Sequence, residues 1–269
     1  MRIIMLAMCG FLAASAVTAK STGKDVGKET AMVVEVEYSI DTMTYVEANV
    51  LATLYHEIGH ALIDKMELPV FAREEDAADT FAVIVTDFLL SPEKAELVTW
   101  ASADQYLQLN HSSKNYDPDY SDVHSHDLVR FYNTICLYYG GDVELRDDFA
   151  EENGLPEDRA ETCESERELA ERSWLAVLKQ IERTDDKAES YDWLIIDEVA
   201  ESDNEYVIAS HKVIEDAVAM FNERFATDFK IRVRMTNCNE DNAFYESYGS
   251  KILMCNELIP PLSRRIDDL

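Results

Sequence analysis

The feature that most constrains this chain is the pentapeptide His56-Glu57-Ile58-Gly59-His60, which lies inside a proline-free segment from Tyr45 to Lys65. Apolar residues recur in this segment at helical spacing, at Val46, Val50, Leu51, Leu54, Ile58 and Leu62, so the sequence predicts a helix. Side chains four residues apart lie on one face of a helix. His56 and His60 can therefore offer two imidazole nitrogens to one metal ion, and Glu57 projects beside them, within reach of a water molecule near that ion.

Two interpretations of the pentapeptide differ in their chemistry. An amphipathic core helix with two hydrogen-bonded histidines would need no metal. A zinc ion with three protein ligands and one open position instead lowers the pKa of a bound water to about 7, which indicates hydrolysis at neutral pH. Gly59 is a poor helix former, at a cost of up to ~1 kcal/mol. We therefore expect another backbone or a substrate to approach closely at this position.

The zinc interpretation requires a third ligand. An elongated motif with a third histidine would need Gly at position 63 and His at position 66, and the chain has Ile63 and Met66, which excludes that class. A carboxylate on the following helix is the alternative. The run Arg73-Glu74-Glu75-Asp76-Ala77-Ala78-Asp79 supplies such carboxylates just after the loop at Leu68-Pro69-Val70.

Within this run, Glu75 and Asp79 are four residues apart and share a helical face, whereas Glu74 has alanine four residues on. Glu75 can complete a zinc site, and Asp79 can accept the remaining N–H of a ligand histidine and so fix its tautomer. A solvated acidic helix start would look similar, because Asp and Glu favour the first turn. Residues 77–85 are nearly all small or apolar, however, which indicates a buried helix whose carboxylates need partners.

The pattern H-E-x-G-H-A-L-I-D, followed by L-P-V and R-E-E-D-A-A-D, resembles a bacterial metallopeptidase family built on a domain of unknown function. The match is close over residues 45–82 and continues through residues 124–140, 155–174 and 238–257. The family shares the pattern of the gluzincins, whose zinc ligands are His, His and Glu. The resemblance implies a mainly helical, zincin-like core with one zinc ion per chain. It implies these roles: His56, His60 and Glu75 as ligands, Glu57 as the general base and Asp79 as the residue that orients a ligand.

A second family pattern, H-x-x-D-x-Q-R, is similar to His124, Asp127 and Arg130, although Val129 replaces the glutamine. A hydrolytic site benefits from a cationic or hydrogen-bonding group that stabilises developing negative charge. His124 and Arg130 are therefore candidate catalytic residues. The sequence supports equally well a His124 that caps the helix and an Arg130 that pairs with a buried acid. His126 does not match the pattern, and we expect it to face solvent.

Residues 1–19 are typical of a secretory signal, with Arg2, an apolar stretch and a cleavage site at Val17-Thr18-Ala19. The apolar stretch is too short to span a membrane. These features predict a periplasmic or secreted protein. The net charge of -30, from 54 acidic and 24 basic residues, argues against binding to nucleic acid or to anionic membrane surfaces.

Cleavage of the signal would leave Cys136, Cys163, Cys238 and Cys255. An even count in an exported chain suggests two disulfides, for which three connectivities are possible. We favour Cys136–Cys163 and Cys238–Cys255, because each pair closes a loop of moderate length within one local module. The segment Asn242-Ala243-Phe244-Tyr245 then lies in a disulfide-braced β-hairpin, or else it forms a rim of the cleft where Tyr245 or Asn242 touches substrate.

The order of elements predicts an α+β fold with a helical core at residues 20–183 and a smaller α/β C-terminal subdomain at 184–269, packed on that core. A short strand is expected at 32–38, and a last strand at 251–255. The other expected helices are 44–66, 74–90, 92–110, 125–139, 157–183 and 206–225, and the other expected strands are 191–199 and 229–235.

These features together predict an exported zinc hydrolase, most simply a peptidase with a peptide or protein substrate. A zinc-stabilised envelope or binding protein without turnover is the alternative. An amidase acting on cell-wall peptide bonds would use the same residues. The sequence leaves the substrate and the oligomeric state open.

Overall fold

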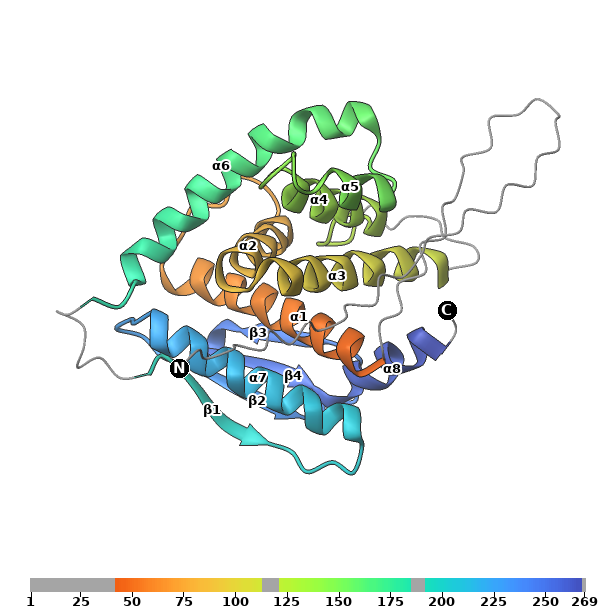
Figure 1. The fold of residues 1–269 in the computed structure, drawn as a ribbon. Coiled ribbons are helices and arrows are strands. Elements are labelled where there is room, and N and C mark those ends of the chain that lie inside the picture. Colours follow the sequence, from red (N-terminus) through yellow and green to blue (C-terminus); the bar gives the residue numbers. More distant parts are fainter. Residues whose placement is uncertain (1–41, 113–120, 185–191, 268–269) are drawn as a thin grey trace, which may run out of the picture. The chain divides into compact units, whose positions relative to one another are not determined.

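The helix that carries the pentapeptide, α1 (Thr42–Lys65), is buried on most of its sides. The computed structural model describes residues 42–112, 121–184 and 192–267. Along α1, the side chains without exposed surface include Tyr45, Val46, Val50, Leu54, Tyr55, Ile58, Ala61 and Leu62. A helix that is apolar around most of its circumference needs neighbours on several sides. In Figure 1, the helices α2 (Glu74–Leu89) and α3 (Pro92–Ser112) lie on one side of α1, and α7 (Glu205–Arg224) and the sheet lie on the other.

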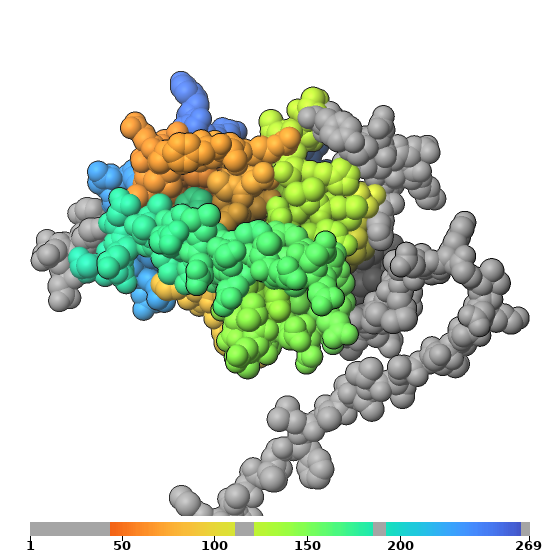
Figure 2. Space-filling model, turned by 90° about the horizontal axis from the view of Figure 1, so that it is seen from above, coloured from red at the N-terminus to blue at the C-terminus, as the bar shows by residue number. Residues whose placement is uncertain are grey.

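The helical layer on the first side also contains α4 (Asp127–Tyr139), α5 (Asp147–Glu152) and α6 (Glu157–Ile181). Figure 2 shows α6, in green, running across the outer face of this layer. The disulfide Cys136–Cys163 joins α4 to α6. Gly140 permits this close approach, because a Cβ at that position would lie 2.2 Å from the carbonyl oxygen of Cys163.

The sheet on the other side has the strand order β1-β2-β4-β3. Its strands are β1 (Leu194–Val199), β2 (Ile231–Thr236), β3 (Ala243–Glu246) and β4 (Lys251–Cys255). β1, β2 and β4 are parallel, and β3 pairs antiparallel with β4. β3 is therefore an edge strand, and it packs against α1. The disulfide Cys238–Cys255 closes the segment that contains β3.

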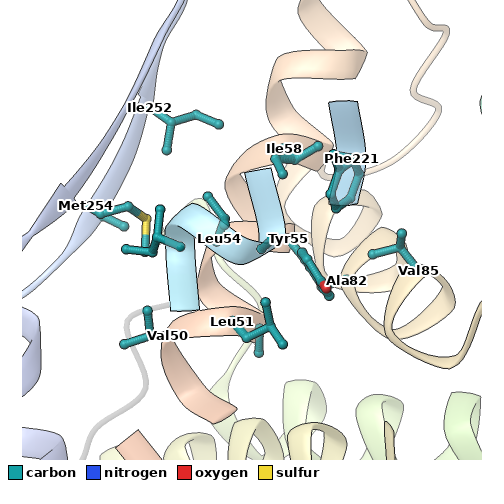
Figure 3. Packing of buried hydrophobic residues seen from close by; sticks show 14 of the residues in the cluster. Val50, Leu51, Leu54, Tyr55, Ile58, Ala82, Val85, Phe221, Ile252 and Met254 are labelled. Atoms are coloured by element: carbon teal, nitrogen blue, oxygen red, sulfur yellow. The ribbon is translucent and has the colours of Figure 1, made fainter. Parts of the chain in front are cut away.

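One hydrophobic cluster connects the helical layer to the sheet through α1. Figure 3 shows Leu54 and Ile58 of α1 packing among side chains from α2, α7 and β4. The cluster also contains Trp174 of α6 and Trp193, which lies just before β1. The core is thus continuous across the boundary at 183/184, and the division into two subdomains stays a prediction.

The structure confirms the predicted fold class, a mainly helical α+β fold with a disulfide-braced C-terminal part. Both favoured disulfides and the hairpin of β3 with β4 are present. The predicted strand at 32–38 lies outside the described residues. The sequence did not predict α5, α8 (Ile259–Asp267) or the 3-10 helices η2 (Ser247–Gly249) and η3 (Asn256–Leu258), because such short elements carry little periodicity.

Helix α6 ends at Ile181, two residues before the predicted end, because Glu182 leaves the helix and forms a β-bridge with Phe225. Within the described residues, no helix combines the length and the apolar character that crossing a membrane requires.

Candidate metal centre

The antiparallel packing of α1 against α2 brings the predicted site residues together. His60 of α1 lies beside Glu75 in the first turn of α2, and His56, one turn earlier, lies beside Asp79. Gly59 explains how the two helices approach so closely. A Cβ at Gly59 would lie 3.1 Å from the Cα of Ala78, so the close backbone expected from the glycine is that of α2.

Three side-chain atoms face one another at this contact. The Nε2 atoms of His56 and His60 are 3.0 Å apart. Oε2 of Glu75 lies 3.3 Å from Nε2 of His56 and 3.2 Å from Nε2 of His60. Zinc bonds of about 2.0–2.1 Å in a tetrahedral arrangement place neighbouring ligand atoms roughly 3.3 Å apart. The spacing of the three atoms therefore suits a metal ion of this size.

The protonation of the two imidazoles also favours a cation between them. Nδ1 of His56 lies 2.8 Å from Oδ1 of Asp79, and Nδ1 of His60 lies 2.8 Å from Oε1 of Glu74. When each imidazole keeps its proton on the Nδ1 that faces a carboxylate, each Nε2 presents a lone pair to the other and to the Glu75 carboxylate. Lone pairs at such distances repel one another unless a proton or a metal ion lies among them. A carboxylate behind each histidine is the usual support of metal-bound imidazoles.

The electrostatics of the site stabilise positive charge. Burial lowers the pKa of His56, but hydrogen bonds to Asp79 and Glu75 and the charges of Asp79 and Glu57 outweigh it and raise that pKa to about 10. Burial would raise the pKa of the Glu75 carboxyl, but hydrogen bonds from His124, His56 and His60 hold it far below its usual range. These two pKa shifts mean that the site favours a proton between His56 and Glu75. A divalent cation can take the place of that proton.

His56, His60 and Glu75 form the candidate metal-binding group, called the metal-binding group below. Glu57 lies beside it on α1, and its side chain is buried. Burial raises the pKa of its carboxyl, while a hydrogen bond from the backbone of Tyr245 and the neighbouring histidines oppose that rise. The carboxyl is therefore held near the metal-binding group by the edge strand β3. A carboxylate in this position can accept a proton from a water molecule near the three residues.

A cleft of about 1370 Å³ opens onto these residues. Its walls come from α1, α2, α3, the segment before α4, and β3 with the residues that precede it. Small-molecule sites are usually about 300–1,000 Å³, so this cleft has room for a larger ligand. The residues around the metal-binding group that line it are His56, Glu57, His60, Glu75, His124 and Tyr245.

Arg130 binds Asp79 rather than any of the three convergent atoms of His56, His60 and Glu75. Its Nε and Nη2 donate to the two carboxylate oxygens of Asp79 at 2.7 and 2.8 Å, and its guanidinium lies 4.1 Å from the ring centre of Tyr106. Burial would raise the pKa of Asp79, but the bonds from Arg130 and His56 hold it well below its usual range. Arg130 therefore pairs with a buried acid, which is one of the two interpretations that the sequence allowed.

His124 faces the metal-binding group from the segment before α4. Its Nε2 lies 3.0 Å from Oε2 of Glu75, and its Nδ1 lies 3.1 Å from Oδ1 of Asp122. Arg73 holds this segment, because its Nη1 donates to the carbonyl oxygens of Asp122, Val123 and His124. The side chain of His124 is 40% exposed, so it remains accessible from the cleft.

The residue that caps α4 is His126, whose Nδ1 accepts from the backbone N–H of Leu128. His126 was expected to face solvent; its side chain is half-buried and closes the first turn of α4. The suggested cap role of His124 also fails, because that ring points to Glu75 instead.

Comparison with protein families gives one match, to the family described as "Putative metallopeptidase", over residues 9–178 and 197–268. The chain belongs to this family. No curated protein and no solved structure matches the chain. Membership in a metallopeptidase family implies a metal, and the His56, His60 and Glu75 group fits one.

The sequence did not reveal every contact in this candidate site. Glu74 was set aside because its partner four residues on is alanine, yet it holds Nδ1 of His60. Tyr106 contacts Arg130 and Asp79 from α3, across a large sequence separation. The acidic run itself was the available signal for Glu74, since two adjacent carboxylates at a helix start can serve two histidines.

A substitution of Arg130 tests the support of Asp79. Arg130→Met would leave the buried Asp79 carboxylate without its cation, so we expect a loss of ~3–5 kcal/mol in the free energy of unfolding. Arg159→Met is the control, because the pair of Arg159 with Glu166 is more exposed and should cost within about 1 kcal/mol. Urea unfolding of both variants at equal metal content provides the measurement. Equal losses in the two variants would contradict the assigned role of Arg130.

Proposed function

We propose that this chain is an exported zinc-dependent peptidase. The observation that carries the proposal is the convergence of His56 Nε2, His60 Nε2 and Glu75 Oε2 within 3.3 Å of one another, with Glu57 beside them in a large cleft. These three residues would hold the zinc ion. Membership in a metallopeptidase family supports peptide bonds as the substrate. The two disulfides support export, with residues 1–19 as the signal.

When bound, zinc would polarise the substrate carbonyl and make water acidic enough to react at neutral pH. Glu57 accepts the proton of the attacking water at its carboxylate and delivers that proton to the leaving amine nitrogen. The reaction consumes one water and breaks one amide bond.

The other residues hold the site in its working geometry. Asp79 faces Nδ1 of His56, and Glu74 faces Nδ1 of His60, so each imidazole keeps its proton on Nδ1. Both Nε2 lone pairs then point to the metal position. Arg130 acts through Asp79. His124, an accessible imidazole 3.0 Å from Glu75, is placed to donate to the carbonyl oxygen as negative charge develops there.

Incubation of the purified chain with a pool of random peptides tests this function. We expect cleavage that a chelator abolishes and that stoichiometric zinc restores. No cleavage, together with a large chelator-induced loss of melting temperature, would instead support a zinc-stabilised binding protein. Cell-wall peptides belong in the same assay, because an amidase would cleave them with the same residues.

A further inference from the structure

One residue of the edge strand β3, Tyr245, makes hydrogen bonds to α1. β3 has a single neighbour, β4, in the sheet that the described residues form, so its other side is free to face α1. The backbone N–H of Tyr245 donates to the carboxyl of Glu57. An outward N–H of an edge strand would otherwise be open to water or to an added strand.

The side chain of Tyr245 makes a second contact with the same helix. Its hydroxyl donates to Oδ2 of Asp64 at 2.6 Å, and it also hydrogen-bonds the side chain of Ser250. The bond to Asp64 lowers the pKa of that carboxyl. Tyr245 thus binds α1 at two positions, Glu57 through its backbone and Asp64 through its phenol.

The spacing of these two positions makes the contact a rigid one. Glu57 and Asp64 are seven residues apart, which is two turns of helix, so both lie on the face that looks toward β3. The distance along the axis is about 10 Å. Two bonds separated by this distance restrict rotation of β3 relative to α1 as well as sliding, whereas a single bond would leave β3 free to pivot about it.

We infer that Tyr245 is a positioning residue for Glu57, with its phenol on Asp64 keeping its amide on the Glu57 carboxyl. This inference rests on the proposed function, because it assigns the contact a purpose in orienting the base. Mispositioning of a catalytic group by ~1 Å can cost about 100-fold in rate. The contact between Tyr245 and Asp64 lies outside the metal-binding group, so its loss should leave zinc binding intact.

Three variants separate the parts of this contact, namely Tyr245→Phe, Asp64→Ala and the double variant. Tyr248→Phe is the control, since Tyr248 lies in the adjacent turn and is fully exposed. The first readout is hydrogen exchange at the Tyr245 amide in metal-free protein, measured also in Glu57→Ala. We expect faster exchange by about 10-fold or more in Tyr245→Phe, Asp64→Ala and Glu57→Ala, and no change in the control.

The second readout is steady-state cleavage. We expect kcat of Tyr245→Phe and Asp64→Ala to fall by about 10- to 100-fold with KM within about 2-fold, because positioning the base matters in the transition state. The double variant should be no worse than the single variants, since both break one contact. Asp64→Ala retains the phenol, so a direct catalytic role of the Tyr245 hydroxyl would leave its kcat unchanged and would overturn the inference.

Exchange at the Tyr245 amide that stays unchanged in Tyr245→Phe, Asp64→Ala and Glu57→Ala would also overturn the inference. Failure of the proposed function has a different signature, namely a wild-type chain without cleavage. In that case the exchange measurement alone decides whether Tyr245 holds Glu57.

Discussion

Glu57→Gln is expected to reduce peptide cleavage by about 10²–10⁴-fold, the range that a general base typically contributes. The amide of glutamine has nearly the shape of the carboxyl and can still receive the backbone N–H of Tyr245, but it cannot accept the proton of the attacking water. Glu57 is not among the three residues whose atoms face one another, so the metal should remain. Zinc content near one per chain, with cleavage reduced by this factor, is the predicted result.

The comparison of activity with metal content makes this test specific. A loss of cleavage together with a loss of zinc would show only that the site had collapsed. Cleavage retained in Glu57→Gln, with zinc bound and no contaminating peptidase, would rule out Glu57 as the base.

Glu75→Ala is expected to abolish zinc binding, because it removes the carboxylate ligand and leaves two histidines. Free zinc at about 1,000 times its Kd stabilises a folded protein by about 4 kcal/mol. In a domain of this size that corresponds to roughly 8–16 °C in melting temperature. We therefore expect added zinc to raise the Tm of the wild-type chain by an amount of this order and to leave the Tm of Glu75→Ala unchanged.

The adjacent residue provides a matched control for this substitution. Glu74→Ala removes the partner of Nδ1 of His60 but no metal-facing atom, so zinc affinity should fall by only about 10–100-fold. At the same free zinc, which is then about 10–100 times the Kd of this variant, zinc should stabilise it by about 1.4–2.7 kcal/mol, so about one- to two-thirds of the wild-type rise in Tm is expected. If calorimetric titration gave the same affinity loss for both variants, Glu75 would not be a ligand.

The convergence of His56, His60 and Glu75 could be predicted from the sequence because local geometry brings most of these side chains together. A helix brings residues four apart onto one face, which accounts for His56 with His60 and for Glu75 with Asp79. Because α2 directly follows α1 in the chain, a short loop is enough to bring the histidine pair of α1 next to the carboxylate pair of α2. The disulfide partners were predictable for a similar reason, since each pair closes a moderate loop within one module.

The residues that sequence reasoning missed or misplaced depend on tertiary contacts instead. Tyr245 reaches Asp64 across a sequence separation of 181 residues, and no local period reports such a contact. The choice between two roles for Arg130 depended on whether an acid lay behind it, and Asp79 fills that place. His126 and His124 are two residues apart in one segment, so only the path of the backbone decides which caps α4 and which faces Glu75.

Crystals of the zinc-loaded chain, with diffraction data collected above and below the zinc absorption edge, test the central claim most directly. A single anomalous peak is predicted at about 2.0–2.2 Å from Nε2 of His56, Nε2 of His60 and a carboxylate oxygen of Glu75. The same peak should be absent from crystals of Glu75→Ala. A peak elsewhere in the chain, or none at these three atoms at saturating zinc, would contradict the assignment of this cleft as a zinc-dependent hydrolytic site.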